Sequence, residues 1–84
     1  MYFVYLLQSE KIKHRFYIGS TPCLVRRIYQ HNNGLVISSR PYRPWKVIYY
    51  EAYLTESLAR LREHGLKQHG NAKRQIKIRA GCFE

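Results

Sequence analysis

Two short runs rich in aromatic and branched residues, separated by a polar break, constrain the fold more than any other feature of the chain. The first run covers residues 2–8, the second covers residues 15–20, and the break lies at residues 9–14. Apolar runs around a short polar segment are typical of a β-hairpin, so we predict two antiparallel strands here. A register that brings Tyr5 near Tyr17 would put both phenols on one face, although the sequence alone does not fix that register.

The first predicted strand carries apolar or aromatic side chains on both faces. These are Phe3, Tyr5 and Leu7 on one face and Tyr2, Val4 and Leu6 on the other. A strand with two apolar faces must be covered on both sides, so we expect it to be the central strand of its sheet.

A helix is predicted over residues 22–32. Thr21 is suited to cap its first free N–H groups, and Pro22 is tolerated at the first helical position. Arg27 and His31 are four residues apart and therefore lie on the same face of this helix. Its expected buried stripe consists of Leu24, Val25 and Ile28.

The second half of the chain is expected to add one strand and two helices. Residues 35–44 contain two prolines and are predicted to be a loop. A strand follows over residues 45–53, with Trp45, Val47, Tyr49, Glu51 and Tyr53 alternating with the other residues. Thr55 should cap the next helix, whose inner stripe would be Leu58, Leu61 and Leu66. We predict a break at residues 70–71, a basic helix over residues 72–79, and a frayed tail over residues 80–84.

This order of elements predicts one α/β (α+β) domain over residues 1–84. Its three-stranded antiparallel-type sheet would be flanked by helices. The connection from the second strand through the first helix to the third strand is long enough to cross over the sheet, and a right-handed crossover leaves the first strand in the middle.

The charge of the chain points to a polyanionic partner. The formal net charge is +10, with 15 Lys and Arg residues against 5 acidic residues. Nucleic acid is the first candidate, and an anionic membrane surface is the second. In the loop, two arginines surround an aromatic ring, a pattern suited to phosphates and a stacked base, although a solvated loop packed by its tyrosine fits equally well. The residues predicted to bind nucleic acid are Arg26, Arg40, Tyr42, Arg43 and Lys46.

No apolar run approaches the ~20 residues that span a bilayer, and the first residues lack the features of a signal peptide. We therefore expect a cytoplasmic protein. Cys23 and Cys82 form no metal-binding or disulfide pattern, so both are predicted to be free thiols.

The acidic residues restrict the chemistry. The chain has no Asp, and its five Glu are dispersed, which argues against a site where several carboxylates hold two metal ions. A site with one carboxylate and one metal ion remains, with phenol, imidazole and guanidinium groups completing it. Glu63 is the candidate carboxylate. The alternative is an ion pair within the helix with Lys67, worth only ~0.2–0.5 kcal/mol.

At these positions the chain resembles the GIY-YIG nuclease superfamily, and most closely its small standalone bacterial members. The resemblance covers roughly residues 2–78 and rests on five positions in order. They are the tyrosine of Val4-Tyr5, the tyrosine of Tyr17-Ile18-Gly19, Arg27, His31 and the later Glu63. Phe3 stands where the superfamily has the glycine of its first motif, and a late Asn of the superfamily has no clear counterpart.

The resemblance implies metal-dependent cleavage of DNA, in repair or in the processing of structured DNA. Tyr5 and Tyr17 would flank the scissile phosphate, and one of them would help to deprotonate the attacking water. Arg27 would bind the phosphate, and His31 would relay a proton or support a tyrosine. Glu63 would hold one divalent cation, Mg²⁺ or Mn²⁺. DNA is the expected partner, with RNA as the second nucleic acid. The alternative is a catalytically weak nucleic-acid-binding module on the same fold.

Overall fold

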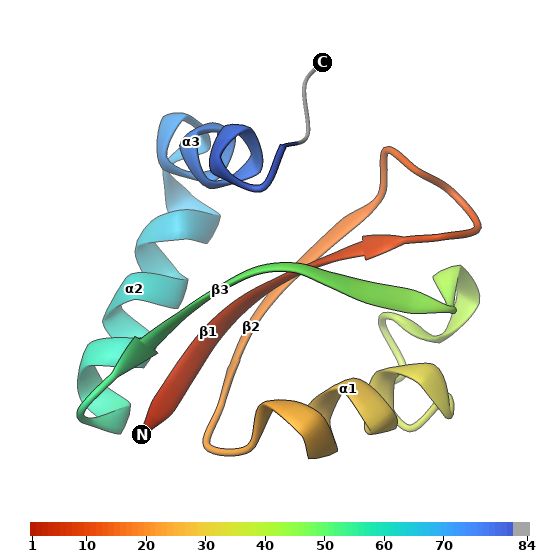
Figure 1. The fold of residues 1–84 in the computed structure, drawn as a ribbon, viewed down its shortest axis with the longest axis horizontal. Coiled ribbons are helices and arrows are strands. Elements are labelled where there is room, and N and C mark those ends of the chain that lie inside the picture. Colours follow the sequence, from red (N-terminus) through yellow and green to blue (C-terminus); the bar gives the residue numbers. More distant parts are fainter. Residues whose placement is uncertain (82–84) are drawn as a thin grey trace.

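The computed structural model describes residues 1–81 and contains one three-stranded antiparallel sheet with helices on both faces (Figure 1). Within that range the strands are β1 (Tyr2–Ser9), β2 (Phe16–Thr21) and β3 (Trp45–Tyr53). The helices are α1 (Leu24–Asn32), α2 (Glu56–Gln68) and α3 (Gly70–Arg79), with a 3₁₀ turn, η1, at Arg40–Tyr42. Cys82 and most of the predicted tail lie outside the described residues.

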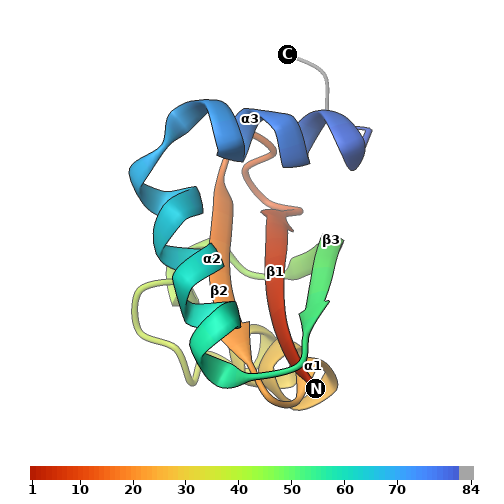
Figure 2. The ribbon, with the colours of Figure 1, turned by 90° about the vertical axis from the view of Figure 1, so that its left-hand side faces the viewer.

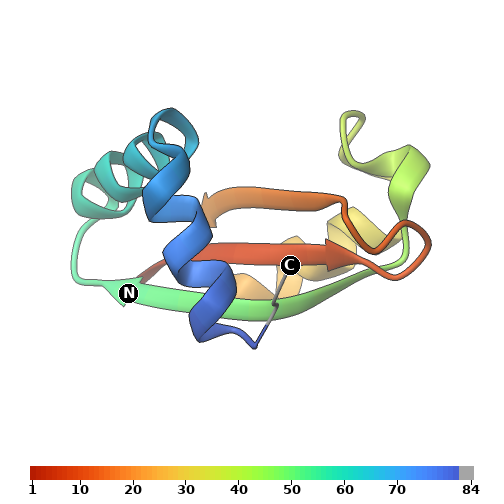
Figure 3. The same ribbon diagram turned by 90° about the horizontal axis from the view of Figure 1, so that it is seen from above.

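The sheet order is β2-β1-β3, so the prediction that the first strand is central is confirmed. Both of its faces are covered, as its two apolar faces require. Figures 2 and 3 show α3 crossing the sheet on the face opposite to α1. None of the helices in residues 1–81 combines the length and apolarity needed to cross a membrane.

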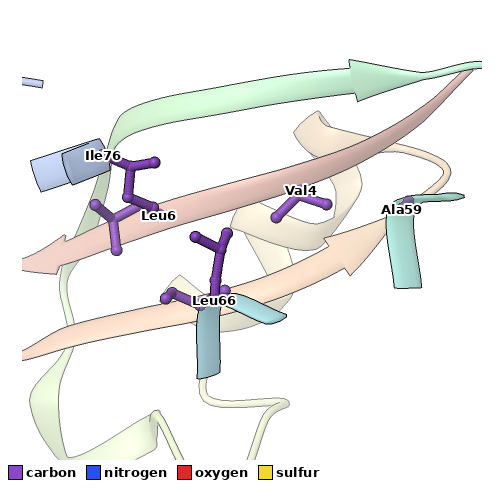
Figure 4. Close-up of a cluster of buried hydrophobic side chains, with 6 residues drawn as sticks. Val4, Leu6, Ala59, Leu66 and Ile76 are labelled. Carbon is purple, nitrogen blue, oxygen red and sulfur yellow. The ribbon is translucent and has the colours of Figure 1, made fainter. Parts of the chain in front are cut away.

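The larger core lies between the sheet and the pair α2 and α3 (Figure 4). Its fully buried members are Val4, Leu6, Ile18, Ala59, Leu66 and Ile76. The smaller core lies on the α1 face, where Tyr5, Leu7 and Trp45 are buried against partly buried side chains of α1. The alternation predicted for β1 is therefore confirmed.

The predicted start of α1 is wrong. Thr21 ends β2, and its Oγ1 accepts a hydrogen bond from the Cys23 N–H at 3.1 Å instead of capping the helix. Cys23 occupies the cap position without a side-chain hydrogen bond, and α1 begins at Leu24. Val25 is 81% exposed and does not belong to the buried stripe, because α1 turns His31 toward the sheet instead.

The predicted cap of α2 is confirmed, since the Thr55 side chain accepts from the Leu58 N–H. Its predicted inner stripe is partly wrong. Leu66 is buried, but Leu61 is 70% exposed and Leu58 is exposed as well, because the small side chain of Ala59 makes the contact with the sheet. The predicted break between the last two helices falls at His69, so α3 begins two residues earlier than expected.

A β-bulge in β3 overturns the simple alternation predicted there. Leu6 pairs with Tyr49 and Leu7 pairs with Val47, which leaves Ile48 as an extra residue. Trp45 and Val47 consequently pack in the α1-side core, while Tyr49 packs in the α2-side core.

Candidate active site

The two tyrosines of the sequence motifs lie on the α1 face of the sheet. Tyr5 pairs with Gly19, and Leu7 pairs with Tyr17, so the two phenols are diagonal neighbours on adjacent strands. Their rings stack at 6.4 Å between centroids with an interplanar angle of 18°. The register that the sequence left open is therefore one that brings both rings together.

Tyr5 is buried beneath the other members of this cluster, with only 1% of its surface exposed. Its hydroxyl lies 2.9 Å from His31 Nε2 and accepts a hydrogen bond from Arg27 Nε at 3.3 Å. One helix supplies both partners, because Arg27 and His31 are one turn apart in α1. Tyr17 is partly exposed, and its ring meets the imidazole edge-on at 4.6 Å.

A serine from the loop after α1 completes this hydrogen-bond chain. Ser39 Oγ lies 2.7 Å from His31 Nδ1 and donates to the Val36 carbonyl at 3.3 Å. With the imidazole proton on Nδ1, the ring donates to Ser39 and its Nε2 accepts the Tyr5 O–H, so that this tautomer gives every group of the chain a partner.

Ser39 did not figure among the sequence-predicted residues. Nothing in its spacing connects it with His31, since the contact depends on the path of the loop. That path is fixed by Trp45, which donates from Nε1 to the Ser39 carbonyl at 2.9 Å and pairs through its backbone with the Asn32 side chain.

The charges of the cluster follow from burial. Burial raises the pKa of Tyr5 to about 12, and burial together with the Arg27 charge lowers the pKa of His31 to about 4. The hydrogen bond with Tyr5 raises the pKa of Arg27. At neutral pH the cluster therefore contains a neutral phenol, a neutral imidazole and a permanently charged guanidinium.

Glu63 lies on the other side of β2 from the tyrosines. Its carboxylate accepts from Ser20 Oγ at 2.5 Å and from Lys67 Nζ at 2.7 Å, and its side chain is 22% exposed. Ser20 alternates with Gly19 along β2 and points toward α2. Ser20 also lines the hollow that adjoins Arg27, so this residue of the edge strand β2 connects Glu63 with the arginine of the tyrosine cluster.

Glu63 is ionised at neutral pH. Burial works against ionisation, but the hydrogen bonds from Lys67 and Ser20 outweigh it and lower the pKa of this carboxyl. Within residues 1–81 no group of three or more His, Cys, Asp or Glu side chains could hold a metal ion. One partly exposed carboxylate beside a hydroxyl fits a hard cation such as Mg²⁺, which keeps several of its waters.

A hollow of about 280 Å³ opens between the end of β2 and α1. Its lining includes Ser20, Arg26, Arg27 and Gln30. Arg27 Nη1 donates to Gln30 Oε1 at 3.0 Å, which turns the guanidinium along the wall of the hollow. A phosphate here would meet a guanidinium that is already oriented.

The remaining residues predicted to bind nucleic acid differ from one another in their surroundings. One face of the Tyr42 ring is covered by the Arg15 guanidinium at 4.0 Å, so that face is not available to a base. Arg40 and Arg43 are both exposed, and Arg40 donates from Nε to the Gly34 carbonyl at 2.8 Å. Lys46 is also exposed, on the opposite face of β3 from its neighbour Trp45.

This fold and cluster define the chain as a member of the GIY-YIG catalytic domain family, whose profile matches residues 1–77. The chain is similar to the structure-specific endonuclease subunit SLX1 of Meyerozyma guilliermondii, with 41% identity over 81 residues that cover 89% of this chain and 27% of that protein. The subunit of the same name from Vanderwaltozyma polyspora is 39% identical over 79 residues, covering 81% of this chain and 25% of that protein. That from Schizosaccharomyces japonicus is 38% identical over 82 residues, covering 93% and 30%.

The chain spans about a quarter to a third of the length of these relatives. They are eukaryotic subunits, so the expected closeness to standalone bacterial members is not confirmed by them.

Proposed function

We propose that this chain is the catalytic domain of an endonuclease that cleaves phosphodiester bonds of structured DNA with one divalent cation, in DNA repair or in the processing of branched intermediates. The observation that carries this proposal is the hydrogen-bond chain from Arg27 through Tyr5 to His31, with Tyr17 stacked beside it. Family membership supports a catalytic role, and the relatives named structure-specific endonuclease subunits support a DNA substrate of defined shape.

Arg27 binds the scissile phosphate in this proposal. Its guanidinium is held on one side by Tyr5 and on the other by Gln30, so that little freedom is lost when a phosphate arrives in the adjoining hollow. A fixed positive charge at this place stabilises the negative charge that develops on the phosphoryl oxygens.

The two tyrosines have different roles. Tyr17 is the more exposed phenol, and its hydroxyl is the one available to orient the attacking water. Tyr5 is buried, and it positions Arg27 and the neutral imidazole of His31 behind the reacting groups. A phenol of raised pKa is a poor base, so Tyr5 holds its proton at neutral pH in the hydrogen bond to His31 Nε2.

Glu63 and Ser20 would hold the cation. When bound there, a divalent cation would supply the positive charge that lowers the pKa of water and stabilises the leaving oxygen. Lys67 Nζ donates to one oxygen of the Glu63 carboxylate and helps to keep the carboxyl ionised.

The test is cleavage of supercoiled plasmid, single strands and a branched duplex with Mg²⁺, with Mn²⁺ and with chelator. We expect cutting of the branched duplex that needs the cation and is lost in Glu63→Gln and Tyr17→Phe. The matched controls are Glu56→Gln, which changes an exposed carboxylate on the same helix, and Tyr29→Phe, which changes an exposed phenol on α1. Both controls should retain activity.

Cutting that persists in Glu63→Gln would refute the assignment of the cation site. If the protein bound the substrates but cut none of them, the proposed endonuclease activity would be refuted. That result would favour a nucleic-acid-binding module on this fold.

A further inference from the structure

A second hollow, of about 260 Å³, lies along the same outer edge of β2. It is lined by Phe16, Tyr17, Ile18, Lys67 and Lys73. Tyr17 therefore belongs both to the tyrosine cluster and to the wall of this hollow. Lys67 also belongs to two places, since its ammonium reaches Glu63.

The lysines around this hollow have too few carboxylate partners. Within residues 1–81, the only ion pair that these lysines form is the one between Lys67 and Glu63. Lys73 is partly buried and forms no ion pair in this range. Lys77 lies beside it, with its ammonium over the Phe16 ring at 4.1 Å. Three lysines thus adjoin an aromatic and apolar wall, and only Lys67 is paired with a carboxylate.

Like charges gathered around one hollow repel one another. Burial, followed by the charge of Lys77, lowers the pKa of Lys73, in the direction that this grouping of lysines requires. An anion that enters the hollow would relieve both effects, because it would replace the lost hydration and separate the two charges.

The position of the hollow indicates which anion. The hollow beside Arg27 is lined by Ser20 and Thr21, and the lysine hollow is lined by Phe16, Tyr17 and Ile18 of the same strand. Tyr17 and Ser20 are three residues apart, or about 10 Å along a strand. A chain of phosphates that crosses the tyrosine site along β2 would therefore pass both hollows.

We propose that the lysine hollow, formed by Lys67, Lys73 and Tyr17 with Lys77 at its rim, binds a second backbone phosphate of the DNA strand that is cut. The strand then lies along the outer edge of β2, with one phosphate at Arg27 and another at Lys73. This inference rests on the proposed function for the identity of the ligand, and it assigns Lys73 a role in binding that is separate from the chemistry.

The test is equilibrium binding of a fluorescein-labelled duplex with a single-stranded flap, measured by fluorescence anisotropy in chelator across a series of salt concentrations. The slope of log K against log salt is negative, and loss of one phosphate contact decreases its magnitude by about 0.9. We expect this decrease in Lys73→Gln. The matched control is Arg74→Gln, which removes the same charge from the next residue of α3 at an exposed position, and its slope should equal that of the parent. Lys73→Arg keeps the charge and should restore the slope.

Single neutral methylphosphonate linkages placed in turn along the labelled strand locate the contact. We expect one linkage that weakens binding of the parent protein and has no effect on Lys73→Gln. Equal slopes for Lys73→Gln and Arg74→Gln, or the same methylphosphonate profile for Lys73→Gln and the parent, would overturn the proposal.

These measurements need no cleavage, so they separate the two proposals. If the salt slopes are as expected but the protein never cuts DNA, the lysine subsite is supported and the proposed nuclease activity is refuted. If the protein cuts DNA but Lys73→Gln has the salt slope of the parent, the nuclease activity is supported and the subsite is refuted.

Discussion

The ring of Tyr5 lies directly over Gly19 on the neighbouring strand, and its Cζ is 2.6 Å from the point that a Cβ on Gly19 would occupy. No real Cβ approaches a ring carbon so closely, so the glycine is required for Tyr5 to reach His31 and Arg27. The requirement is one of space, because Gly19 belongs to a regular strand with no left-handed backbone angle.

Gly19→Ala should therefore displace the Tyr5 ring and break the hydrogen bonds of its hydroxyl. We expect a loss of about 1–3 kcal/mol in the free energy of unfolding, measured by urea denaturation, together with loss of cleavage. The control is Gly65→Ala in α2, where an added Cβ meets nothing within 4 Å. That change should stabilise the protein by about 0.5–1 kcal/mol. Equal effects of the two substitutions would contradict the steric argument.

The buried imidazole of His31 predicts a pH dependence of stability. Its folded pKa of about 4 lies below its ordinary value of 6.5, so the unfolded chain binds the extra proton first as the pH falls. The full contribution is present above pH 6.5 and is lost between pH 6.5 and pH 4. We expect the free energy of unfolding to fall by about 2 kcal/mol from pH 7 to pH 5.

The measurement is urea denaturation at several pH values. His31→Gln should be less stable at pH 7 and should lose most of this pH dependence. The control is His64→Gln, an exposed residue of α2, which should keep the slope of the parent. A parent protein whose stability is the same at pH 7 and pH 5 would show that the imidazole is not held neutral.

Ser39→Ala tests the outer end of the hydrogen-bond chain. Without the hydroxyl, His31 Nδ1 loses its partner inside the protein, since both residues are fully buried. An unsatisfied buried group costs about 1–3 kcal/mol, which unfolding in urea would detect. Ser38→Ala removes the hydroxyl of an exposed neighbour and should change stability by less than about 0.5 kcal/mol. Equal stability of the two variants would show that the hydrogen bond between Ser39 and His31 does not contribute to folding.

Glu51 holds the far half of β3 to α2. Its carboxylate accepts two hydrogen bonds from Arg62, at 2.8 and 3.0 Å, and one each from Tyr49 and Tyr53. The hydrogen bonds from Arg62, opposed by burial and assisted by the two phenols, lower the pKa of Glu51 to about 2. This contribution to stability is present above the ordinary carboxyl pKa of 4.5 and is lost as the pH falls toward 2.

Glu51→Gln should lower the free energy of unfolding by about 2 kcal/mol at pH 7, because it leaves the Arg62 guanidinium without its charged partner. The loss should shrink between pH 4.5 and pH 2, where the parent carboxyl becomes protonated. Glu56→Gln changes an exposed pair with Arg60 and should cost less than about 1 kcal/mol at either pH. A cost for Glu51→Gln that does not depend on pH would indicate a role in packing alone.

The arrangement of the sheet could be predicted from the sequence because it depends on alternation. Two apolar faces made β1 central, and the alternation along β1 and β2 placed Tyr5 and Tyr17 on one face once the register was known. Helix faces were less predictable. Val25 and Leu61 have apolar side chains at helical spacing, but spacing does not reveal which side of a helix is covered when several sides carry apolar residues.

The supporting residues of the candidate site could not be predicted in the same way. Ser39 reaches His31 only because Trp45 and Asn32 fix the loop between them, and this is a property of three-dimensional packing. The pairing of Glu63 with Lys67 was foreseen as an alternative to a role in cation binding. The contact between Glu63 and Ser20 depends on how α2 packs along β2, and only the structure shows it.

The bulge at Ile48 has a consequence for how this family can vary in length. Regular pairing assigns successive residues to opposite faces, so an insertion or deletion elsewhere in β3 would exchange the core-facing and outward-facing side chains. At Ile48 one residue is already supernumerary. A chain without it would form an unbroken ladder with β1, in which Val47 still faces α1 and Tyr49 still faces α2. A chain with one residue fewer at this position would therefore keep the facing of every other side chain of β3, and would lose only the contact of Ile48 with the α2-side core.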